Sequence, residues 1–86
     1  MKDYLCLRGI IGGCENKVIF ERGEIYQGLR LETYQFEILK VDKVRFFKKD
    51  GTSWIFSNRK DIGRLPNFIL VEDIYLEEVL EFIKRN

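Results

Sequence analysis

The stretch that decides the fold class is Val44-Arg45-Phe46-Phe47-Lys48-Lys49-Asp50-Gly51-Thr52-Ser53-Trp54-Ile55-Phe56. Two runs rich in aromatic and branched residues flank an Asp-Gly pair. An Asp-Gly pair between such runs is the strongest short-range signal for a β-hairpin. The centre of the chain is therefore predicted to form two antiparallel strands joined by a tight turn.

The register of this hairpin depends on the length of its loop. A two-residue loop would pair Phe47 with Trp54, whereas a three-residue loop with Gly51 in the left-handed conformation pairs Phe46 with Trp54. We predict the three-residue loop, because it separates apolar from mixed residues more cleanly. It collects on one face the side chains of Val44, Phe46, Trp54 and Phe56, and on the other those of Arg45, Phe47, Ser53 and Ile55.

The residues before the hairpin also favour short strands. We predict strands at 4–11 and 18–20, a turn at 12–16, and a tight turn at 21–24 in which Gly23 takes a positive φ. Residues 25–26 begin another strand that breaks near Gly28. Residues 34–41 alternate apolar and polar side chains, which is the pattern of a single half-buried strand.

The pattern changes after the hairpin. The polar stretch 57–67 is predicted to be a loop, and the apolar run 68–71 a buried closing strand. Residues 72–85 follow helical spacing, with Asp73 as the predicted N-cap. The predicted apolar face of this helix consists of Ile74, Leu76, Val79, Leu80 and Ile83.

These elements predict a mainly β fold, with a C-terminal α-helix (72–86) packed on a β-barrel (1–71). Five or six short strands suit a small SH3-like barrel best, and an OB-like barrel is the alternative. The chain has 86 residues, of which 45% are apolar, so we expect a single domain, 1–86.

The composition argues against an enzyme. The chain has no His, which excludes Ser-His-Asp triads, Cys-His dyads and His-ligated zinc. Cys6 is predicted to be a small buried residue in a strand and Cys14 to lie in a loop, without the partners that a metal site or a reactive thiol needs. We therefore expect no catalysis, no cofactor and no metal.

The sequence also bears on compartment. Residues 1–20 do not have the pattern of a signal peptide, and no apolar run approaches the roughly 18 residues that cross a bilayer. We expect a cytoplasmic protein that has no membrane partner.

The net charge of +1 conceals an uneven distribution. Residues 1–39 sum to −1, residues 40–71 to +5 and residues 72–86 to −3. The basic middle predicts a contact surface for a partner, since opposed charged surfaces favour recognition. The predicted contact residues are Arg45, Phe47, Lys48, Lys49, Arg59, Lys60 and Arg64.

Three kinds of partner suit such a surface. The first is another protein, and the second is a nucleic acid whose phosphates contact the same basic residues. The third is another copy of the chain, as in a structural or virion-associated assembly, held through the helix face Tyr75, Val79 and Phe82. The alternative to all three is a solvated hairpin tip whose lysines only protect a sheet edge.

A family resemblance adds to this interpretation. Residues 20–26 have the form Phe-x-x-Gly-x-x-Tyr, follow a strand with Cys6, and precede the Asp50-Gly51 turn. Over residues 4–57 the chain resembles small SH3-like proteins of phages and prophages of Gram-positive bacteria, although residues 27–49 and the terminal helix depart from their short form. The resemblance implies an SH3-like fold, a viral setting, and binding and inhibition of a host enzyme such as a defence nuclease.

Overall fold

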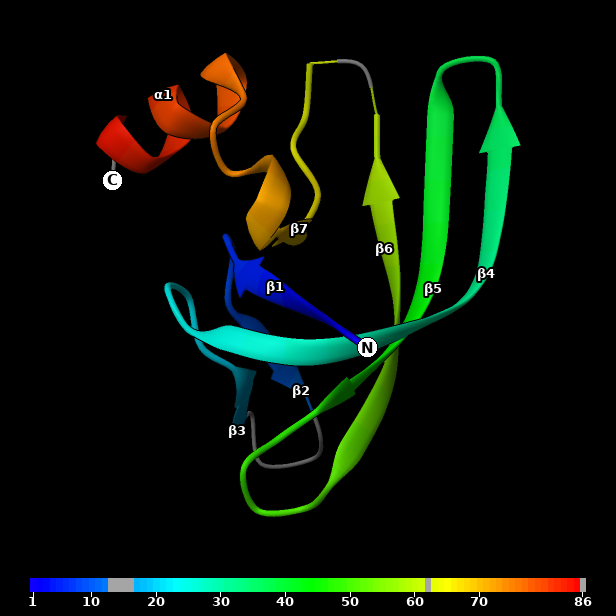
Figure 1. Ribbon diagram of the computed structural model, residues 1–86, viewed down its shortest axis with the longest axis vertical. Coiled ribbons are helices and arrows are strands. Elements are labelled where there is room, and N and C mark those ends of the chain that lie inside the picture. Colours follow the sequence, from blue (N-terminus) through cyan, green and yellow to red (C-terminus); the bar gives the residue numbers. More distant parts are fainter. Residues whose placement is uncertain (13–16, 62, 86) are drawn as a thin grey trace.

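The central hairpin forms with the predicted register in the computed structural model, which describes residues 1–12, 17–61 and 63–85 (Figure 1). Strands β5 (Leu39–Phe47) and β6 (Ser53–Lys60) pair Phe46 with Trp54. Gly51 has a φ of 88°, as the three-residue loop requires. Asp50 accepts hydrogen bonds from the backbone and side chain of Thr52, which lower the pKa of its carboxyl group.

The other strands complete two antiparallel sheets. The five-stranded sheet has the order β6-β5-β4-β1-β7, with β1 at Lys2–Cys6, β4 at Ile25–Phe36 and β7 at Phe68–Leu70. Strands β2 (Ile10–Gly12) and β3 (Lys17–Phe20) form the second sheet. The mainly β fold with a C-terminal helix is confirmed. The sheet does not close, since β6 and β7 remain its edges.

Strand β4 corrects two predictions. The strand does not break at Gly28 but runs through it, because the missing side chain makes room for Tyr4. A Cβ atom at Gly28 would lie 2.8 Å from the Tyr4 ring and from a Val44 methyl group. Residues 34–41 are not one strand but the end of β4, a turn at Glu37–Ile38 and the start of β5, where Phe36 pairs with Leu39.

The first predicted strand is also divided. Residues 4–11 form the end of β1, a bend at Leu7–Arg8 and the start of β2. The bend lets the chain change sheets, with Leu7 N–H donating to the Asn67 carbonyl at 2.7 Å. Gly23 has a positive φ of 87°, as predicted for the turn at 21–24. Residues 13–16, including Cys14, lie outside the described part of the chain, so the turn predicted there stays a prediction.

The stretch 57–67 is not wholly a loop, because β6 continues through Lys60 and Asn58 is buried. The Asn58 amide donates to the Phe68 carbonyl at 2.8 Å and its Oδ1 accepts from Phe68 N–H at 3.1 Å. Asn58 thus connects β6 with β7, the two edge strands. A buried polar side chain is tolerated at this position because its hydrogen bonds replace the backbone hydrogen bonds that β6 and β7 do not form with each other.

Two hydrophobic clusters hold the fold together. The larger contains Tyr4, Cys6, Phe20, Val44, Phe46 and Phe68. Phe46 stacks on Phe68 at a centroid distance of 4.0 Å, and Phe20 contacts both rings edge-on. The smaller cluster contains Leu7, Leu65, Ile69 and Val79 and fastens the C-terminal helix to the sheet.

The C-terminal segment corrects the predicted helix bounds. A 3₁₀ turn covers Val71–Asp73, and helix α1 covers Glu77–Arg85, so Asp73 does not cap the helix. Val79 is buried, and Phe82 packs on the smaller cluster. The Arg8 and Arg22 guanidinium groups lie 5.5 Å and 5.6 Å from the Phe82 ring centroid, which places cations against an aromatic face.

The predicted apolar face of this helix is only partly buried. Three of its side chains are exposed: Leu76, Leu80 and Ile83. No helix among the described residues is long and apolar enough to cross a membrane.

Candidate functional site

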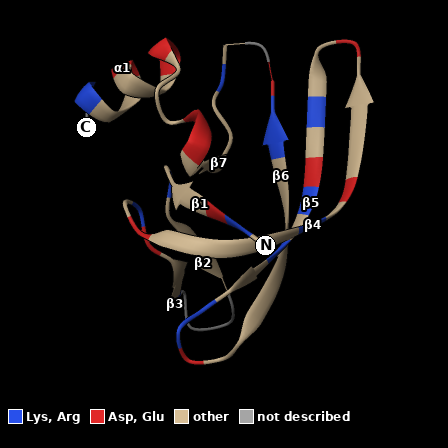
Figure 2. Cartoon of the chain, viewed as in Figure 1, with Lys and Arg blue, Asp and Glu red and all other residues tan. Residues whose placement is uncertain are grey.

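The seven predicted contact residues do not form one patch (Figure 2). Lys48 and Lys49 lie at the β5–β6 turn, whereas Lys60 ends β6 and Arg64 lies in the loop beyond it. The seven residue steps along β6 span about 23 Å at the rise of a β-strand. The basic middle of the chain is thus divided between opposite ends of the sheet.

Acidic residues compensate some of these cations. Arg59 Nε lies 3.3 Å from an Asp61 carboxylate oxygen, and Lys60 Nζ lies 4.0 Å from Glu78 on the C-terminal helix. All four side chains are largely exposed or half-exposed, so these ion pairs contribute little stability. Part of the charge asymmetry of the sequence is therefore balanced within the fold.

The outer face of β4, β5 and β6 brings together three of the predicted residues: Arg45, Phe47 and Arg59. The side chains of Arg45 and Phe47 alternate with those of buried Val44 and Phe46, so they point away from the core. Arg59 pairs with Val41 and shares this outer face. We call this surface the outer sheet face.

Arg45 lies at the centre of one row across the outer sheet face. It pairs with Leu29 on one side and with Ile55 on the other, and these apolar neighbours are 43% and 50% exposed. Its guanidinium donates to the Ser53 hydroxyl at 3.1 Å. Among the described residues, no carboxylate forms an ion pair with Arg45.

Further along the outer sheet face, aromatic side chains are exposed where β4 and β5 extend past the core. Tyr34 is exposed, and Phe36 is 62% exposed. The Tyr34 hydroxyl donates to the Glu32 carboxylate, and this interaction raises the pKa of the phenol. A bulge at Leu31 shifts the pairing between the two halves of β4.

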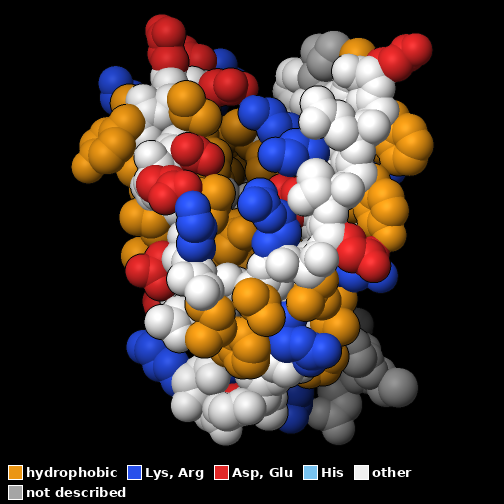
Figure 3. Space-filling view, turned by 45° about the vertical axis from the view of Figure 1, so that its right-hand side comes forward, with side chains coloured by type: hydrophobic (Ala, Val, Ile, Leu, Met, Phe, Trp, Pro, Cys, Tyr) orange, Lys and Arg blue, Asp and Glu red, His pale blue; other side chains and the backbone are white. Residues whose placement is uncertain are grey.

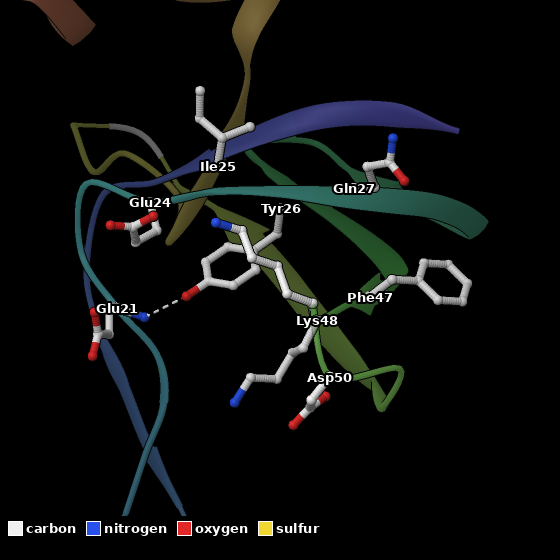
Figure 4. Close-up of a pocket in the computed structure, with 9 residues that line it drawn as sticks. Glu21, Glu24, Ile25, Tyr26, Gln27, Phe47, Lys48 and Asp50 are labelled. Carbon is white, nitrogen blue, oxygen red and sulfur yellow. Dashed lines mark hydrogen bonds between the residues drawn. The ribbon is translucent and has the colours of Figure 1, made fainter.

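A groove of about 550 Å³ lies beside the β5–β6 turn (Figure 4). Glu21 and Glu24 line it on one side, and Lys48, Lys49 and Asp50 line it on the other. Tyr26 lies between them, and its hydroxyl accepts a hydrogen bond from Glu21 N–H at 2.9 Å. The groove thus gives Lys48 and Lys49 a shaped surface next to acidic residues.

The helix face proposed for self-association is not available as predicted. Val79 is completely buried and Phe82 packs on the sheet, so only Tyr75, at 81% exposure, is free to meet another copy. Sequence periodicity identified the helix but did not identify which side the sheet covers.

Three exposed residues of the outer sheet face were absent from the seven predicted contact residues: Leu29, Tyr34 and Phe36. Apolar residues recur at every second position at 29 and 31 and again at 34 and 36, and this pattern is equally typical of a buried face. Only the position of the core, on the other side of the sheet, shows that this face is exposed rather than buried.

Neither a reactive thiol nor a metal centre is found in the described residues. Cys6 is buried, its Sγ donates to the Arg8 carbonyl at 3.1 Å, and burial raises the pKa of the thiol to about 11. It is therefore protonated at neutral pH and a poor nucleophile. No three Cys, Asp or Glu side chains of the described residues are placed to hold a metal ion.

Comparison with known proteins leaves the assignment to the geometry. The chain matches no family model, and no curated protein or solved structure is similar to it.

Proposed function

We propose that the protein is a non-catalytic binding module that uses the outer sheet face to bind another protein. The partner presents an apolar surface with a carboxylate opposite Arg45. One observation carries the proposal: half-buried Arg45, which forms no ion pair with a described carboxylate, lies between exposed Leu29 and Ile55. Arginine surrounded by apolar and aromatic residues is typical of the energetic centre of protein interfaces.

The distribution of charge favours a protein over a nucleic acid. A nucleic-acid surface needs cations that follow the phosphate backbone, usually with rings that stack on bases. Here the lysines of the turn are separated from Arg59 and Lys60, at the far end of β6, by an apolar stretch that includes Ile55. Arg59 and Lys60 are also paired with acidic residues.

The resemblance to small phage barrels extends the proposal to a particular kind of partner. In that version the partner is a bacterial enzyme, such as a defence nuclease, and the module inhibits it by occupying its surface. The β5–β6 turn with Lys48 and Lys49 then forms the rim of the contact, where charges increase the association rate more than the affinity.

Affinity capture with matched variants tests the outer sheet face. The bait proteins are wild type, Arg45→Glu, and Lys84→Glu as the control with the same charge reversal at the exposed end of the helix. From a lysate of a Gram-positive host, we expect a protein that wild type and Lys84→Glu retain and that Arg45→Glu loses. The purified partner should then bind Arg45→Glu at least about tenfold more weakly, since an interfacial charge pair is broken.

A charge exchange makes the test specific. Replacing the partner's carboxylate residue by Arg should restore binding to Arg45→Glu. If every specifically retained protein binds both charge-reversal variants equally, the outer sheet face is not the binding surface. A mobility shift of short nucleic acids at low salt, or a dimer in light scattering that Arg45→Glu dissociates, would replace the proposal by one of its alternatives.

A further inference from the structure

A small polar pocket of about 90 Å³ lies on the opposite, inner face of the sheet. It lies in the hollow between the extended β4–β5 hairpin and the C-terminal segment, where Lys and Arg side chains gather (Figure 3). Its lining includes Tyr4, Arg30, Lys40, Asp42 and Asp73. None of these residues belongs to the outer sheet face, so the pocket is separate from the proposed binding surface.

Tyr4 places its hydroxyl group at this pocket. The residue as a whole is only 5% exposed, and its ring lies against Gly28 of β4 and contacts Phe46 edge-on at 5.2 Å. The hydroxyl has no hydrogen-bond partner among the described residues, and it is accessible to the pocket, because every fully buried side-chain oxygen and nitrogen of these residues has a partner. Burial is the main cause that raises the pKa of Tyr4, so the hydroxyl is protonated at neutral pH and can donate.

Two cations complete the set of donors. Arg30 follows Gly28 by two residues on the same face of β4, and Lys40 lies on the inner face of β5, opposite Gln35. Neither forms an ion pair with a described carboxylate. Three hydrogen-bond donors from β1, β4 and β5 therefore line the pocket, and none of them is bonded to an acceptor of the described residues: the Tyr4 hydroxyl, the Arg30 guanidinium and the Lys40 ammonium.

The acidic groups around the pocket limit what it can bind. Asp42 lines the pocket and accepts a hydrogen bond from the Thr33 hydroxyl at 2.7 Å. Asp73 also lines it, while Lys2 is paired with Glu72 at 3.0 Å nearby. Two cations, Arg30 and Lys40, and two anions, Asp42 and Asp73, line the pocket. A ligand is therefore held by directed hydrogen bonds rather than by an excess of positive charge. This charge balance disfavours a long polyanion and suits one small group.

We propose that this pocket binds a single oxyanion group, a phosphoryl or carboxylate group, through Tyr4, Arg30 and Lys40. A planar guanidinium and an ammonium are the donors that recognise such groups, and the rigid ring directs a third hydrogen bond. The volume admits one group of this size. The site does not depend on the protein-binding function proposed above.

Titration with inorganic phosphate, followed by NMR at constant ionic strength, tests the site. We expect saturable shifts of the Tyr4 ring and the Arg30 side chain, with a dissociation constant in the millimolar range. Tyr4→Phe should weaken binding at least about fivefold, the equivalent of one hydrogen bond to a charged group. The same variant should keep its melting temperature, since the hydroxyl has no hydrogen-bond partner in the described part of the chain.

Two lysines of β5 provide a matched control. Lys40→Gln should weaken phosphate binding, whereas Lys43→Gln, on the outer sheet face of the same strand, should not. Acetate in place of phosphate distinguishes the two sources: tighter binding of acetate assigns a carboxylate ligand, and tighter binding of phosphate assigns a phosphoryl group. Absence of saturable shifts, or equal weakening by both glutamine variants, overturns the proposal.

Discussion

Asn58 shows how one side chain decides the way the two edges of the sheet meet. The β6 and β7 backbones do not form a ladder, and the carboxamide supplies one donor and one acceptor to Phe68 instead. Asn is the residue type whose side chain reproduces both groups of a peptide unit. A sheet that backbone pairing leaves open is therefore bridged at one point by a side chain.

Replacing Asn58 by Ala should destabilise the protein by about 2–4 kcal/mol. The change removes two buried hydrogen bonds and leaves the Phe68 N–H and C=O groups without partners. Urea unfolding followed by circular dichroism measures the effect. Ser57→Ala, at the next position but on the outer face, is the control and should change the free energy of unfolding by less than about 0.5 kcal/mol. Equal effects of the two variants would show that the bridge does not stabilise the fold.

At the scale of elements, helix α1 is attached by few contacts. Val79 is its only fully buried residue among those described, and Phe82 lies against Arg8 and Arg22. A helix of 9 residues is too short to be stable alone, so its contacts with the sheet maintain it. The exposed apolar side chains of the same helix contribute little to this attachment.

Two substitutions on this helix should therefore differ strongly. Val79→Ala should lower the free energy of unfolding by about 1–3 kcal/mol, because it leaves a cavity in the smaller hydrophobic cluster. Leu80→Ala removes a larger side chain that is already partly in water, and Ala favours the helix, so its effect should stay below about 1 kcal/mol. Thermal unfolding of both variants checks this order, and the reverse order would mean that the helix packs through its other side.

At the scale of the whole molecule, the core occupies only part of the long β4–β5 hairpin. Val44 and Phe46 are fully buried, whereas β4 is exposed from Leu29 to its end at Phe36. The distal half of the hairpin is thus stabilised by its own backbone pairs, by the pairing of β5 with β6, and by surface contacts such as the hydrogen bond of Thr33 to Asp42. This half also forms one wall of the hollow that contains the polar pocket.

Amide hydrogen exchange should reveal this division. Hydrogen-bonded amides between Glu32 and Val41 should exchange at least about a hundredfold faster than those of Val44 and Phe46, because the distal half opens without exposing the core. Exchange measured by NMR at neutral pH tests this directly. Uniform protection along β5 would show instead that the hairpin and the core open together.

The central hairpin was predictable because its information is local. The Asp50-Gly51 pair specifies the turn, and the period-2 pattern on both sides selects the register, so no distant residue is needed. The C-terminal helix was predictable in type for the same reason. Its start was not, because the 3₁₀ turn at Val71–Asp73 is set by the strand that precedes it.

The sequence by itself determined the strand-rich class, the hairpin register, the terminal helix and the absence of histidine chemistry. Only the tertiary structure decided that Gly28 lies inside a strand, that a turn interrupts residues 34–41, and that the predicted basic residues separate. Gly28 depends on a partner far along the chain, the Tyr4 ring beside it. The other two depend on the strands that form: β4 and β5 end and begin where Phe36 pairs with Leu39, and β6 lies between Lys49 and Lys60. Local patterns specify which residues alternate, but packing specifies which side the core covers.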